Sequence, residues 1–224
     1  MPLRRPRLMV ALSPQDPTYI RLENHFQDGW THPNKPKPQV HAIFSIRLDT
    51  QLSSCFFMEP VEAVCWATRK QGRNYVKKSD CLLCSVIRNS FDVSKCGKRH
   101  RFCRFGAGIY TTACSSKADD YFIGVPESPF RAVLVNRVVV GNPLIQQYNA
   151  EEITELPYGY HSVAGVPGGD LNYEETVVYN NDAIRPAYLI VYSAHQPSDK
   201  FRGNFSAFVA RRQARKLTKV KKSH

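Results

Sequence analysis

Two separate stretches of this sequence carry residue types that could form a reactive site. The first is Arg104-Phe-Gly-Ala-Gly-Ile-Tyr110, where the glycines let the backbone turn tightly or approach a ligand closely. The second is residues 171–179, where Glu175 opens an apolar, β-prone run. A tyrosine ring can stack on a flat ligand, and a fixed carboxylate can stabilise a developing positive charge. Each motif is weak alone, and both gain meaning only if the fold brings them together.

Several strands are needed to position these motifs. Alternating or β-branched runs predict strands over residues 40–48, 61–67, 131–141, 176–179 and 187–192. A short helix is expected near residues 19–26, and another over 115–121, where a small polar run suits a helix start. Residues 81–91 could form a helix or a strand with a turn. The 15 prolines and 12 glycines favour a loop-rich mixed or β-heavy domain over a helical bundle.

The positive charge of the chain, +12 in total, is concentrated at its ends. Residues 211–224 contain seven Lys or Arg and no acid, and Arg4, Arg5 and Arg7 add three more. The remaining body carries about +2, unlike a dedicated DNA-binding domain. The basic tail could contact nucleic acid, a nuclear-import receptor or an acidic protein surface, or it could be a solvated terminus without a specific role.

Seven cysteines lack the regular spacing of a secreted disulfide framework, so we expect reduced thiols. Five residues could form a structural zinc site: Cys81, Cys84, Cys96, His100 and Cys103. Only the first pair has a familiar spacing. We therefore prefer scattered thiols beside a basic loop, and predict no metal site.

Six blocks in order resemble the catalytic domain of poly(ADP-ribose) polymerase-like proteins, especially the compact fungal form. They are residues 30–35, 81–91, 104–110, 115–121, 159–163 and 171–192. The resemblance covers roughly residues 25–192, most of the body. It implies an α+β fold, namely a split antiparallel β-sandwich of the ADP-ribosyltransferase type with short flanking helices. It also implies NAD as co-substrate, bound in a cleft with its nicotinamide deep inside.

The resemblance assigns roles to individual residues. Tyr110 and Tyr121 match the two tyrosines that stack on nicotinamide. Lys117 matches a lysine beside the catalytic glutamate. Glu175, not Glu174, aligns with that glutamate when the following Val-Val-Tyr is set on the family strand. Glu175 would hydrogen-bond the nicotinamide ribose and stabilise oxocarbenium-like charge as nicotinamide leaves, and Tyr110 would complete the catalytic pair.

The predicted NAD-binding site departs from the family pattern in two places. Gly108 is retained there, and its lack of a side chain lets a ligand approach the backbone. The family's first motif is His-Gly-Thr or His-Gly-Ser, and the candidate here is Trp66-Ala67-Thr68. Ala67 could still offer its main-chain groups, whereas Trp66 has one N–H donor, no acceptor and a larger ring. Ala118 stands where the family has a serine that hydrogen-bonds the nicotinamide carbonyl. Each lost hydrogen bond costs about 0.5–1.5 kcal/mol, so NAD should bind more weakly.

These observations predict an NAD-dependent ADP-ribosyltransferase that acts on a protein or other macromolecular acceptor. Transfer of a single unit is the more cautious expectation, because no acceptor-side determinant is recognised. The alternative is a catalytically degenerate binding module of the same fold, favoured by Trp66 and Ala118. A third, weaker hypothesis is a zinc-stabilised nucleic-acid binder.

The organisation we expect is one domain over residues 25–196, after a loosely structured lead-in at 1–24 and before a basic extension at 197–224. No apolar run reaches the length of a membrane span, and the N-terminal apolar run is too short for a signal peptide. We therefore expect an intracellular protein, cytoplasmic or nuclear, without a membrane partner.

Overall fold

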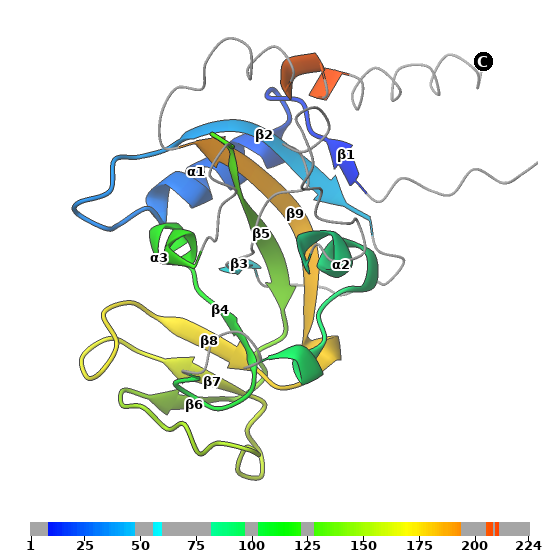
Figure 1. Ribbon diagram of the computed structural model, residues 1–224. Helices are drawn as coiled ribbons and strands as arrows, with labels where there is room; N and C mark the ends of the chain where they lie inside the picture. The colour runs from blue at the N-terminus through cyan, green and yellow to red at the C-terminus, as the bar shows by residue number, and fades with distance from the viewer. Residues whose placement is uncertain are drawn as a thin grey trace, which may run out of the picture.

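A computed structural model of the chain shows an α+β arrangement with two β-sheets and few helices (Figure 1). It describes residues 9–47, 56–59, 82–96, 103–121, 128–193, 205–207 and 209–210. The strand expected over residues 61–67 lies outside this part of the chain.

The larger sheet, sheet A, has five antiparallel strands. Their order is β1 (Met9–Ala11), β2 (Gln39–Ile46), β9 (Ile184–Ser193), β5 (Arg131–Val138) and β3 (Phe56–Glu59). The two longest pairings join β9 to β2 and to β5. Most side chains of β5 and β9 are buried on both faces of the sheet, which explains why their sequences are mostly apolar rather than alternating.

The smaller sheet, sheet B, has the order β4 (Ile109–Thr111), β8 (Glu175–Val178), β7 (Ser162–Gly165) and β6 (Pro143–Gln146). The first three strands are antiparallel, but β6 runs parallel to β7. Sheet B is therefore mixed, whereas the resemblance implied antiparallel strands throughout.

The helices are short and lie beside sheet A. They include α1 (Pro17–Asp28), α2 (Leu82–Asn89) and α3 (Ser115–Asp120), with 3-10 turns at Val93–Lys95 and Asn181–Ala183. Residues 205–207 and 209–210 are helical as well. The side chain of Asp16 caps α1 by accepting a hydrogen bond from the Thr18 N–H at 2.9 Å. Residues 81–91, which the sequence left open, contain the helix α2.

Buried side chains lie on both faces of sheet A. On one face, Leu22 and Phe26 of α1 pack with Ile43, Val133 and Ile190 of the sheet. On the other face, a second cluster joins α2 and Phe205 to the sheet; its members include Leu83, Ile87, Phe44, Leu134 and Leu189. The helix α1 includes residue 24, where the sequence suggested the boundary between the lead-in and the domain. Its buried residues lie before that position (Tyr19 and Leu22) and after it (Phe26), and all three belong to the first cluster.

Sequence patterns located the helices α1 and α3, the long strands and β8, and missed the other short strands. The expected helices near residues 19–26 and over 115–121 are α1 and α3, and the expected strands at 40–48, 131–141, 176–179 and 187–192 correspond to β2, β5, β8 and β9. The strands β1, β3, β4, β6 and β7 were not anticipated. Each has only three or four residues, too few to show a periodic pattern. The strand β8 is as short, but the β-branched run Thr176-Val177-Val178 marked it.

A buried carboxylate fastens α3 to sheet A. Asp119, only 5% exposed, accepts a hydrogen bond from the Tyr192 hydroxyl at 2.7 Å. Its two oxygens also pair with Arg131 Nε at 2.8 Å and Lys35 Nζ at 3.1 Å. Arg131 adds a hydrogen bond from Nη2 to the Asp119 carbonyl at 3.0 Å. The position of α3 is thus set by charged and polar contacts from three separate segments.

We expect Asp119→Asn to lower the free energy of unfolding by about 2–3 kcal/mol, since hydrogen bonds to a charged group contribute about 1.5–3 kcal/mol each. Urea unfolding followed by circular dichroism measures this change. The matched control is Asp182→Asn, because Asp182 pairs with Arg185 through a carboxylate that is 84% exposed. The control should change stability by less than about 1 kcal/mol; equal losses in both variants would contradict the anchoring role of Asp119.

Candidate functional site

Strands β4 and β8 bring the two sequence motifs together. Tyr110 of β4 lies opposite Val177 of β8 in the antiparallel register. Side chains two residues apart on a strand point to the same face, so Glu175 shares a face of sheet B with Val177 and Tyr110. The phenol and the carboxylate expected to act together therefore lie on one side of one sheet.

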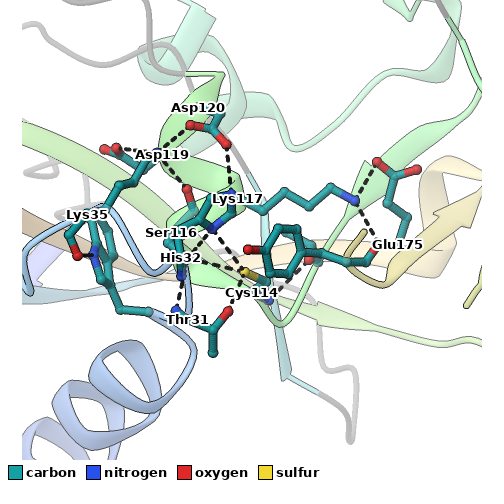
Figure 2. Close-up of polar contacts among 12 residues, drawn as sticks. Thr31, His32, Lys35, Cys114, Ser116, Lys117, Asp119, Asp120 and Glu175 are labelled. Carbon is teal, nitrogen blue, oxygen red and sulfur yellow. Dashed lines mark hydrogen bonds and ion pairs between the residues drawn. The ribbon is translucent and has the colours of Figure 1, made fainter. Parts of the chain in front are cut away.

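Glu175 is a buried carboxylate compensated by two cations. The residue is 7% exposed. Lys117 extends from α3 so that its Nζ lies 2.8 Å from Glu175 Oε1, as Figure 2 shows. Arg104 Nε lies 3.5 Å from Glu175 Oε2. Such partners offset the solvation that a carboxylate loses on burial.

The second oxygen of this carboxylate keeps hydrogen-bonding capacity. Among the described residues, Glu175 Oε2 is buried and has no hydrogen-bond partner. The Arg104 contact at 3.5 Å is an ion pair and is too long for a strong hydrogen bond. A buried acceptor in this state can take a hydrogen bond from a ligand hydroxyl.

Lys117 is held by more than the ion pair. Its ammonium group also donates to the carbonyls of Tyr173 at 3.1 Å and Glu174 at 3.3 Å. Burial lowers the pKa of Lys117, and the hydrogen bond and charge of Glu175 oppose that shift. The lysine side chain therefore links α3 to the residues that lead into β8.

The hydroxyl of Tyr110 closes the turn before its own strand. It accepts a hydrogen bond from the Phe105 N–H at 2.8 Å and donates to the Gly106 carbonyl at 2.7 Å. Gly106 has φ of +72°, and a Cβ there would lie 1.8 Å from the Ile153 carbonyl oxygen, so only glycine fits. The half-buried Tyr110 ring packs on the sheet B core of Phe105 and Val177.

Two of the positions predicted to bind NAD, Gly108 and Ala118, are buried in the protein interior. A Cβ on Gly108 would lie 2.3 Å from Val177 Cγ1, so strand packing is sufficient to explain this glycine. Ala118 is 1% exposed, and its methyl group packs in the core beneath α1. Tyr121, by contrast, follows α3 and is 42% exposed. Burial, and then the negative charge of Glu175, raise the pKa of Tyr121, so this phenol lies within the electrostatic reach of Glu175.

The remaining predicted positions, Trp66, Ala67 and Thr68, lie outside the described residues. Cys81 and His100 of the zinc hypothesis lie there as well. In the described part of the chain, no group of three or more His, Cys, Asp or Glu side chains could hold a metal ion. No helix in that part is long and apolar enough to cross a membrane.

Residues 30–35 form a second polar cluster with α3, also shown in Figure 2. Ser116 Oγ accepts hydrogen bonds from the N–H groups of Thr31 at 3.0 Å and His32 at 3.1 Å. It lies 2.7 Å from His32 Nδ1 as well. The His32 ring stacks on Tyr173, with centroids 4.2 Å apart, and its Nε2 lies 3.3 Å from Asp120 Oδ2. His32 thus joins α3 to the segment that carries Glu175.

Sequence reasoning gave no role to two residues of this site. Arg104 opens the glycine-rich motif, and His32 lies in one of the family-like blocks. Both pair with residues far along the chain, so no local spacing could reveal the contacts.

Comparison with known proteins gives a local similarity. No protein-family model matches the chain. A stretch of 62 residues is 40% identical to poly(ADP-ribose) polymerase 1 of the frog Xenopus laevis. This stretch is 28% of the present chain and 6% of the frog protein. The chain therefore contains a region similar to part of a poly(ADP-ribose) polymerase.

We expect Tyr110→Phe to lower the free energy of unfolding by about 1–2 kcal/mol, because the loop loses the partner of Phe105 N–H and of the Gly106 carbonyl. The loss should depend on pH. Burial raises the pKa of Tyr110, so the folded protein keeps the phenol proton where an unfolded tyrosine, with a pKa of about 10, gives it up. The contribution of Tyr110 is complete below about pH 10 and declines above it.

Urea unfolding at pH 8 and at pH 10.5 measures the difference between wild type and Tyr110→Phe. The difference should be smaller at the higher pH. Tyr158→Phe is the control, since Tyr158 is fully exposed and should have no effect at either pH. A Tyr110→Phe penalty that is identical at both pH values would contradict a buried, protonated phenol.

Proposed function

We propose that this protein is an NAD-dependent ADP-ribosyltransferase. It would transfer a single ADP-ribose unit from NAD to a macromolecular acceptor and release nicotinamide. The observation that carries the proposal is the buried Glu175 carboxylate, with Oε1 on Lys117 and Oε2 without a hydrogen-bond partner among the described residues. The local similarity to the frog poly(ADP-ribose) polymerase supports the same chemistry. On this proposal, the two sheets correspond to the split β-sandwich of ADP-ribosyltransferases.

The reaction breaks the bond between nicotinamide nitrogen and ribose C1′. The bonding electron pair leaves with nicotinamide, and C1′ becomes electron-poor until a nucleophile of the acceptor bonds to it. A carboxylate already fixed in a site of low dielectric stabilises that positive charge more strongly than water does. Glu175 fits this role because its contact with Lys117 and the pairing of its strand, β8, with β7 hold it in place before any ligand arrives.

The residues present fit the nicotinamide end of NAD. Glu175 Oε2 is positioned to accept a hydrogen bond from a ribose hydroxyl. The Tyr121 ring, partly exposed at the end of α3, can stack on the nicotinamide ring, and the Tyr110 ring lies on the Glu175 face of sheet B. Lys117 keeps the buried carboxylate compensated without occupying Oε2.

A second function, that of a binding module without transferase activity, is favoured by one observation. Ala118 replaces the serine expected to hold the nicotinamide carbonyl, and it is buried in the core. Calorimetry with a non-hydrolysable NAD analogue separates the two proposals. Binding supports the transferase, and absence of binding supports the module.

We expect Glu175→Gln to reduce transfer of label from NAD, measured as kcat/KM, by at least about a hundredfold. The variant keeps the size of the side chain and removes the charge that stabilises the transition state. Release of free nicotinamide should fall in parallel. The circular dichroism spectrum and unfolding midpoint of the variant must be measured to show that it folds.

Glu174→Gln is the matched control. Glu174 precedes Glu175 directly, and alternation along an extended chain directs its side chain to the opposite face. The control should keep wild-type transfer within about threefold. Equal labelling by Glu175→Gln and wild type would exclude catalysis by Glu175.

A further inference from the structure

Arg104 joins three loops of sheet B at the edge of the candidate site. Its Nη1 donates to the Asp170 carbonyl at 3.0 Å and to Asn149 Oδ1. Its own carbonyl accepts a hydrogen bond from the Ala150 N–H at 2.8 Å. Both the backbone and the side chain of this arginine are therefore held.

The loops that hold Arg104 are also joined to one another. The Asn149 N–H donates to Asp170 Oδ2 at 2.9 Å, and the Asp170 N–H donates to the Gln147 carbonyl at 2.9 Å. A Cβ on Gly169 would lie 2.4 Å from the Gln147 carbonyl oxygen, so the two loops are in close contact. The guanidinium is thus held by loops that are hydrogen-bonded to one another.

From this fixed position, Arg104 Nε reaches to 3.5 Å from Glu175 Oε2. The planar, always-charged guanidinium attracts the carboxylate oxygen along a defined direction. At this distance it does not consume the hydrogen-bonding capacity of Oε2. Lys117 acts on the other oxygen, so the carboxylate lies between a cation from α3 and a cation from the loops of sheet B.

We propose that Arg104 is a positioning residue for Glu175. It sets the orientation of the carboxylate so that Oε2 faces the ribose, and it makes this orientation depend on the loops at residues 147–150 and 168–171. The proposal rests on the proposed transferase function. It adds a residue that does not touch the substrate and acts only through Glu175.

The kinetic prediction follows from a role in orientation. Arg104→Gln should lower kcat by about tenfold to a hundredfold, the effect of a small displacement of a catalytic group. KM for NAD should change by less than about threefold, because an interaction needed mainly in the transition state affects kcat. Arg104→Lys keeps the charge and should recover part of the loss. Asn149→Ala keeps Arg104 but removes one of its anchors, and should give an intermediate kcat.

A double-mutant cycle with Glu175→Gln tests whether Arg104 acts through the glutamate. If it does, Arg104→Gln should lower the residual activity of Glu175→Gln by less than about twofold. The same cycle on the urea unfolding midpoint gives a second readout that needs no activity. There, Arg104→Gln should destabilise wild type more than it destabilises Glu175→Gln, since only wild type retains the buried charge.

Arg185→Gln is the matched control. Arg185 also holds a loop, through the carbonyls of Asn181 and Ile184 and the carboxylate of Asp182, but it has no contact with Glu175 among those the structure shows. It should lower stability without changing kcat. Additive effects in the cycle, or the same kcat loss in Arg185→Gln, would overturn the role of Arg104. Absence of NAD turnover and NAD binding in wild type would instead overturn the proposed function.

Discussion

The site depends on the compensation of one buried negative charge. A carboxylate cannot be withdrawn from water unless a cation or hydrogen-bond donors replace the lost solvation. Glu175 belongs to sheet B, whereas its nearest cation, Lys117, belongs to α3, which is fastened to sheet A. The ion pair therefore joins the two sheets, and the geometry of the site is correct only when both sheets and α3 are in place.

The charges that place α3 form a chain of contacts leading to this pair. Asp119 holds α3 on sheet A through Arg131, Lys35 and the Tyr192 hydroxyl. On the same short helix, Ser116 contacts the segment at residues 30–35, and Lys117 points in the direction of β8. A helix of six residues has little stability of its own, so these tertiary contacts, not helix propensity, fix the lysine.

The sequence predicted the helices and strands that have a local pattern of residues. It missed the contacts between residues that lie far apart in the chain. The strands β5 and β9 are long and mostly apolar, so pattern alone located them. The three-residue strand β4 leaves no pattern, although it places Tyr110 opposite Val177. The pairing of Lys117 with Glu175 followed from family resemblance, since no spacing rule joins residues so distant. Gly108 was expected to admit a ligand, but contact with Val177 already requires glycine there.

If the protein is the proposed transferase, Ala118 and Glu175 would affect different steps of the reaction. On the proposed function, Ala118 lacks a hydroxyl that would contact the nicotinamide carbonyl equally before and during reaction, so its absence would weaken NAD binding throughout and raise KM. In the proposed reaction Glu175 would act mainly when C1′ becomes positive, so its retention would preserve kcat. A site that has lost ground-state contacts but kept its fixed carboxylate is therefore expected to work slowly at low NAD and normally near saturation. Inactivity at saturating NAD would require a defect in the carboxylate or in the residues that orient it.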